Sequence, residues 1–166
     1  MIDLLHKFSI VNAVPATTGN GAEAGDYVSM KDAHAIWTIM TFKRPTAGAC
    51  AITHEVASDF AGTGSSAVST GVQHWASTET MLAGGEYLTP RTTLAYAYTL
   101  PSSTGIALVV SRFDPSVISA NSGSSNTHYC VKLGTLGTGN DAFSATYFIE
   151  NRYSGIRKVL ATTSST

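Results

Sequence analysis

Strict alternation of side-chain type is the feature that most constrains the fold of this chain. Between residues 93 and 100, four large side chains alternate with four small ones: Leu94, Tyr96, Tyr98 and Leu100 against Thr93, Ala95, Ala97 and Thr99. A period of two places neighbouring side chains on opposite faces of a β-strand, so one face is expected to meet a core. Since no stretch shows a convincing helical period, we expect an all-β fold.

A second strand is expected over residues 34–43. Its apolar side chains occupy both even-numbered and odd-numbered positions, which is typical of a strand in the middle of a sheet. Ile36, Met40 and Phe42 would lie on one face, and Trp37 and Ile39 on the other. Further strands are expected over residues 4–14, 49–56, 71–77, 106–112, 128–136 and 145–153.

Segments rich in Gly, Asn, Ser and Thr separate these runs, at residues 17–21, 62–64, 84–85, 101–105, 121–123 and 137–141. About eight antiparallel strands joined by turns predict a jelly-roll-like β-sandwich. A Greek-key sandwich of another wiring stays open, because strand order cannot be deduced from one sequence.

The 166 residues are expected to contain one folded domain. We predict an N-terminal strand or arm with a flexible connection over residues 1–25, the sandwich over residues 26–160, and a polar tail over residues 161–166.

Charged residues make up 13% of the chain, and the net charge is −1. Soluble proteins usually carry about twice that share, so the surface is expected to be rich in hydroxyl groups instead. Such a surface suits packing against other copies or a larger shell, because little charge must be desolvated; a monomer with an uncharged polar surface is the alternative. Nucleic-acid binding is not expected without a basic surface.

The start of the sequence has neither a basic segment nor a continuous apolar run, and no stretch approaches the roughly 20 apolar residues that span a bilayer. We therefore expect no signal peptide and no membrane partner. Cys50 and Cys130 lie in apolar runs 80 residues apart, which favours buried free thiols in a reducing compartment over a disulfide.

Motifs for catalysis or cofactor binding are weak. The glycine-rich segment 62–66 lacks the Gly-Lys-Ser/Thr of a phosphate loop, and no Gly-x-Ser-x-Gly elbow is present. His34, His54 and His74 are evenly spaced but form no short ligand pair, so we expect no metal site. Because the other motifs are also absent, we expect no cofactor and no enzyme activity.

Glu55 and Asp59 lie close together at the end of an expected strand. Two carboxyl groups across a groove are what a glycosidase needs. The interpretation that we prefer is a structural corner of Glu55, Asp59, Gly62 and Gly64, in which the carboxylates accept hydrogen bonds from the turn amides.

Three segments carry a resemblance to a known family: residues 26–31 followed by 34–42, residues 55–68, and residues 145–153. From about residue 26 to 153 the chain resembles the head decoration or cement proteins of tailed phages, which have a jelly-roll β-sandwich. The resemblance implies a structural virion protein, made in the host cytoplasm, that binds between major capsid subunits, commonly as a homotrimer, and stabilises the capsid surface without catalysis.

A different function stays open: a carbohydrate-binding or receptor-binding module of a phage tail, since aromatic side chains can stack on sugars. The candidates are Trp37, Trp75, Tyr96 and Tyr98. Because all four lie inside expected strands, packing in the core is the interpretation that we prefer for them.

Contacts with neighbouring subunits are expected at the two chain ends. The N-terminal candidates are apolar and the C-terminal ones are basic: Leu4, Leu5, Phe8 and Ile10, then Arg152, Arg157 and Lys158. An N-terminal arm would add to the sheet edge of a neighbour, and the basic group would meet an acidic capsid surface. The alternative is that residues 4–14 form an ordinary strand of their own domain.

Overall fold

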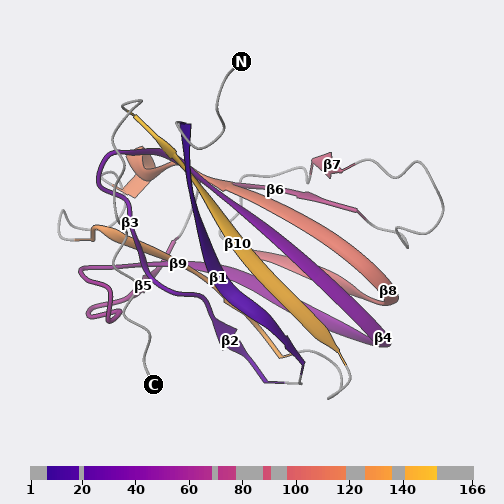
Figure 1. Cartoon of the computed structure of the whole chain (residues 1–166). Helices are drawn as coiled ribbons and strands as arrows, with labels where there is room; N and C mark the ends of the chain where they lie inside the picture. The colour runs from indigo at the N-terminus through magenta and orange to yellow at the C-terminus, as the bar shows by residue number, and fades with distance from the viewer. Residues whose placement is uncertain are drawn as a thin grey trace.

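The structure is a computed structural model that describes residues 7–18, 21–68, 71–77, 88–90, 97–118, 126–135 and 141–152. Strands dominate these residues, every strand pair is antiparallel, and the strands form two facing layers (Figure 1). The expected all-β class and antiparallel sandwich are confirmed.

The strands have very unequal lengths. They are β1 (Phe8–Thr18), β2 (Glu23–Ala24), β3 (Val28–Ser29), β4 (Ala33–Ala57), β5 (Ser66–Ala67), β6 (Val72–Ala76), β7 (Thr89–Pro90), β8 (Ala97–Phe113), β9 (His128–Leu133) and β10 (Ala142–Asn151). A short 3₁₀ turn, η1 (Pro115–Val117), follows β8.

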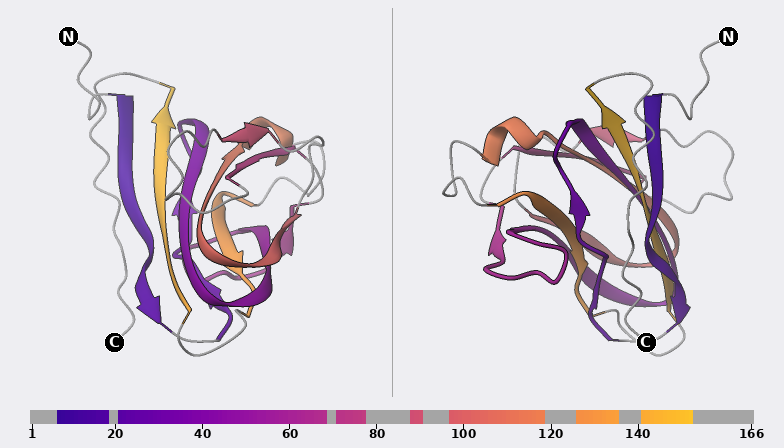
Figure 2. Two further views of the ribbon diagram at one scale, coloured as in Figure 1. Left: turned by 90° about the vertical axis from the view of Figure 1, so that its right-hand side faces the viewer. Right: turned by 60° about the vertical axis from the view of Figure 1, so that its left-hand side comes forward.

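Two long strands, β4 and β8, belong to both layers. They pair with each other from Ile36↔Phe113 to Thr53↔Ala97, and Figure 2 shows them curving together from one layer into the other. The first layer has the order β1-β10-β4-β8-β6-β7, using the first half of β4 and the second half of β8. In the second layer, the other half of β4 pairs with β9, and β9 pairs with β2 and β3.

β4 and β8 each bend and continue at a place where the sequence predicted that a strand would end. Residues 34–43 and 49–56 were expected as separate strands, and 101–105 as a turn, but these segments lie inside β4 and β8. The β4–β8 register shifts between Arg44 and Gly48 and again between Gly48 and Cys50, and Gly105 has a φ of 117°. Bulges and glycine bend a strand without ending it, so local turn chemistry was an incomplete guide here.

Side chains from both layers fill the space between them. In the first half of β4, Ile36, Met40 and Phe42 point inward and are fully buried. Trp37 and Ile39 lie on the opposite face and are only half-buried. The central position expected for this strand is confirmed, since it lies between β10 and β8, but only its inner face is in the core.

The described N-terminal residues are part of the sandwich. β1 pairs with β10 of the same chain, and Glu23–Ala24 pairs with β9. Gly25 donates its amide to the carbonyl of Val131 at 2.8 Å. Residues 8–18 are therefore an edge strand of their own domain, and residues 23–25 are tied to the second layer rather than forming a free connection. The expected polar tail, 161–166, lies outside the described residues.

Arg44 lies at the bend with 2% of its surface exposed. Its Nη1 atom donates to the carbonyl of Gly48 at 2.7 Å and to that of Pro101 at 2.5 Å, which joins the bent parts of β4 and β8. Burial lowers the pKa of its guanidinium.

We expect Arg44→Met to lower the free energy of unfolding by about 2 kcal/mol, because hydrogen bonds from a charged donor are lost at the bend. Lys43→Met is the matched control, since Lys43 is exposed in the same strand, and it should change stability little. Urea denaturation of both variants measures the difference. Equal stabilities would show that Arg44 does not hold the bend.

Candidate interaction surface

The predicted corner is a tight loop after β4. Asp59 accepts a hydrogen bond from the amide of Thr63 through Oδ1 at 2.9 Å, and hydrogen bonds from Thr63 lower the pKa of the Asp59 carboxyl. Gly62 and Gly64 have φ values of 80° and 62°, a region that favours glycine. Asp59 thus caps the turn as expected.

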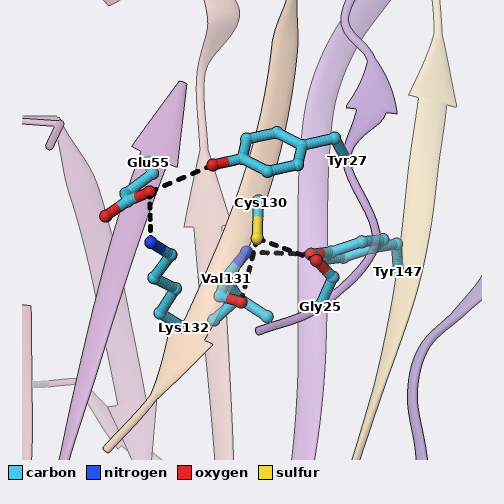
Figure 3. Close-up of polar contacts among 7 residues, drawn as sticks. All are labelled: Gly25, Tyr27, Glu55, Cys130, Val131, Lys132 and Tyr147. Atoms are coloured by element: carbon cyan, nitrogen blue, oxygen red, sulfur yellow. Dashed lines mark hydrogen bonds and ion pairs between the residues drawn. The ribbon is translucent and has the colours of Figure 1, made fainter. Parts of the chain in front are cut away.

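Glu55 has different partners from those expected. Its Oε2 atom accepts from the hydroxyl of Tyr27 at 3.0 Å and lies 2.7 Å from Nζ of Lys132, as Figure 3 shows. The expectation that Glu55 caps the turn amides was therefore wrong. Its side chain instead joins β4 to β9 and to the segment between β2 and β3, and Tyr27 also packs against Gly62.

Gly62→Ala should destabilise the protein more than Gly64→Ala. A Cβ atom at Gly62 would lie 2.7 Å from Cε2 of Tyr27, whereas one at Gly64 meets nothing within 4 Å. Backbone strain alone costs about 1 kcal/mol, and the overlap at Gly62 should add roughly 1 to 3 kcal/mol. Thermal melting of both variants tests this, and equal melting temperatures would argue against the Tyr27 contact.

Both cysteines are free and buried, as the sequence predicted. The Sγ atom of Cys130 donates to the carbonyl of Gly25 at 2.9 Å (Figure 3). Burial raises the pKa of Cys130 to about 12 and that of Cys50 to about 11. Both are thus thiols at neutral pH, and thiols are poor nucleophiles and metal ligands.

Two of the three evenly spaced histidines meet in the core. His54 Nε2 lies 2.9 Å from His74 Nε2, and His54 Nδ1 lies 2.6 Å from the hydroxyl of Tyr129. The Tyr129 hydroxyl also lies 3.3 Å from Oγ1 of Thr38. His34 is exposed and is not part of this chain of hydrogen bonds.

Burial lowers the pKa of His54 to about 3 and that of His74 to about 4, because an imidazolium would be desolvated between the layers. Both rings are therefore neutral near pH 7. Among the described residues, no group of three or more His, Cys, Asp or Glu side chains is arranged to hold a metal ion. In the same part of the chain, no helix is long and apolar enough to cross a membrane.

These two histidines should make the protein less stable in acid. In the unfolded chain they take up protons below about pH 6.5, whereas in the folded protein they stay neutral until about pH 4 and 3. The free energy of unfolding should therefore fall as the pH drops from 6.5 to 4, by up to roughly 1.4 kcal/mol per pH unit for each histidine. Urea denaturation across this range should give a smaller slope for His74→Phe; an unchanged slope would contradict the assignment.

The outward side of the first layer, here called the outer face, is largely apolar. The strand register sets its side chains in rows across β1, β10, β4, β8 and β6: Ile10, Phe148, Trp37, Arg112 and Gln73 in one, then Asn12, Thr146, Ile39, Val110 and Trp75 in the next. Phe8 lies beyond the first row, paired with Glu150, and Leu108 lies beyond the second row, paired with Thr41. Most of these side chains are half-buried, and Ile10 is 45% exposed.

Two tryptophans lie near the middle of the outer face. The rings of Trp37 and Trp75 are stacked, with centroids 5.7 Å apart and an interplanar angle of 26°. The guanidinium of Arg112 lies 5.7 Å from the centroid of Trp37. The preferred interpretation of both tryptophans as core residues was wrong, because strand alternation places them on the side away from the core. Tyr98 does pack against the core, and Tyr96 lies outside the described residues.

The predicted subunit contacts are separated in the structure. Phe8 and Ile10 belong to the outer face. Arg152 follows β10, where its amide donates to the carbonyl of Asp32 at 2.8 Å and its Nε to that of Ala33 at 3.0 Å. Leu4, Leu5, Arg157 and Lys158 lie outside the described residues.

A separate open groove of about 640 Å³ lies beside the corner loop, with Met30, Phe60 and Arg152 in its lining. Phe60 is 40% exposed, and its ring contacts that of His128 edge-on, with centroids 4.2 Å apart. Phe60 is thus an exposed aromatic side chain outside the five strands of the outer face.

No family model and no curated protein matches the sequence. Among solved structures, the chain is similar to the SPBc2 prophage-derived protein YomS, at 8% identity and a TM-score of 0.39, over 85% of this chain and 92% of that one. It is also similar to a structure of the infectious bursal disease virus Gt strain, at 13% identity and a TM-score of 0.23, over 93% and 43% of the two chains. At these TM-scores neither similarity establishes a shared fold or function.

Proposed function

We propose that this protein is a structural virion protein without catalytic activity, which decorates a phage capsid and stabilises it by binding between major capsid subunits. The observation that carries the proposal is the outer face. Apolar side chains from five strands form a continuous surface there, and surfaces of this kind mark sites of protein association.

The composition of the outer face supports a protein partner. The centres of protein interfaces are enriched in aromatic residues and Arg and depleted in other charged residues. Trp37, Trp75 and Phe148 supply the aromatic side chains, and Arg112 already packs against Trp37. Large rigid side chains of this type commonly dominate binding energy.

The state of the potentially reactive groups supports a role without catalysis. His54 and His74 are buried and neutral, and Cys50 and Cys130 are buried thiols. The glycosidase alternative loses support, since Glu55 is held by Tyr27 and Lys132 while Asp59 caps a turn.

A carbohydrate-binding module is the second candidate, because Trp37 and Trp75 lie outside the core. Sugars stack on flat aromatic faces flanked by hydrogen-bonding groups, and Gln73 and Arg112 lie in the same rows. The stacking of the two rings on each other covers part of both, which favours the protein partner.

The decisive experiment uses heads of the phage that carries this gene, prepared without the protein. We expect the added protein to co-sediment with these heads and to raise the temperature at which they come apart, because contacts repeated over a shell oppose subunit separation. Trp75→Lys should weaken binding at least 10-fold, while Phe60→Lys, an exposed aromatic outside the outer face, should bind as the wild type does.

Failure of the wild-type protein to bind heads would overturn the proposal. Saturable binding to an oligosaccharide, lost in Trp75→Lys and kept in Phe60→Lys, would support the carbohydrate-binding module instead.

A further inference from the structure

We propose that a second copy of this chain covers the outer face, so that two copies pack face to face about a two-fold axis. This inference rests on the proposed function in one respect, namely that the outer face is an assembly surface. In the free protein the second copy covers the outer face, and because capsid binding uses the same face, the dimer must separate when the protein binds a capsid.

The size of the outer face is close to what a dimer needs. Two rows of five side chains and a third row of three, namely Ser144, Thr41 and Leu108, cover roughly 440 Å² per copy, with strands about 4.8 Å and rows about 7 Å apart. Two copies would bury roughly 900 Å², just below the lower limit for a stable specific interface, so a weak dimer is expected. Packed sheets lie about 10 Å apart with their side chains interdigitated, which fits rows of Trp, Ile, Val and Phe.

The charged side chains in and beside the two central rows of the outer face have partners within one copy, and the exposed Lys43 lies beyond these rows. Lys7 pairs with Glu150 at 2.9 Å. Arg112 lies against Trp37, and its positive charge acts on the carboxylate of Asp114. Two identical faces can therefore meet without bringing an uncompensated charge into the contact, which is the main cost that a charged surface would add.

Two copies could also associate by strand addition at β1, the edge strand of the first layer, but β1 is poorly suited to such pairing. An extended strand could add to β1, but β1 contains Pro15 and has register shifts between Asn12 and Val14 and between Val14 and Thr17. Proline and bulges are the features that protect sheet edges from such pairing. The outer face is thus the better surface for a second copy.

Light scattering after size-exclusion chromatography tests the proposal. At about 100 µM the wild type should have the mass of a dimer, and Ile10→Lys and Trp75→Lys should each weaken the dimer at least 10-fold, because each would place a lysine in an apolar contact. Phe60→Lys replaces a side chain of similar exposure outside the outer face and should leave the dimer intact. Circular dichroism would confirm that each variant is folded.

Cross-linking gives a second test that does not disturb the apolar centre. Thr41 is exposed in β4, the middle strand of the five, so Thr41→Cys should give dimers with a short bis-maleimide. Ala61→Cys, exposed on the corner loop, should not. Cys50 and Cys130 are buried and should not react in the folded protein.

A wild type that is monomeric at this concentration and gives no cross-linked Thr41→Cys dimer would overturn the inference. So would a trimer whose mass is unchanged in Ile10→Lys and Trp75→Lys, because a surface cannot meet its own copy about a three-fold axis. If such a protein still binds phage heads, the proposed function stands without the dimer. If the dimer forms and heads are not bound, the dimer stands without the proposed function.

Discussion

The pairing of β4 with β8 is the interaction on which the rest of the structure depends. Both strands run through both layers, so one continuous ladder sets the position of each layer relative to the other. Arg44 bonds to two carbonyls where the ladder bends. The remaining strands add to this frame: β10 and β1 on one side of the first layer, β6 on the other, and β9 in the second layer. The buried His54–His74 pair and the outer face both follow from it.

Side-chain periodicity predicted the all-β fold class correctly, but it did not predict where one strand ends and the next begins. Alternation in residues 93–100 and apolar runs elsewhere predicted strands, and strands dominate the described residues. Of the segment 93–100, residues 97–100 begin β8, and residues 93–96 lie outside the described residues. The segment 101–105 has the composition of a turn but lies inside β8, because a partner strand supplies hydrogen bonds that local propensity does not register. In residues 34–43, apolar side chains on both parities predicted burial of both faces and so placed Trp37 in the core, whereas in the structure only the inner face of this strand is in the core.

Among the candidate sites, contacts between residues close in sequence were predictable, and contacts between distant strands were not. The Asp59 turn was predictable, since its partners lie within five residues. The partners of Glu55, Tyr27 and Lys132, come from distant strands, and no local pattern marks them. The spacing of His54 and His74 matches no metal-ligand motif. Their side chains are nevertheless in contact in the structure, because they face each other from the two layers. Contacts that depend on strand order could not be predicted while the strand order was unknown.

The continuity of β4 and β8 also determines how the molecule bears load. In a sandwich whose layers are joined only by loops, a force that separates the layers is opposed by side-chain packing alone. Here the same force also acts along two covalent backbones, and separating the layers requires both strands to straighten at the bend, which breaks the hydrogen bonds that Arg44 donates to Gly48 and Pro101. Two layers joined in this way resist separation more than layers joined by loops alone.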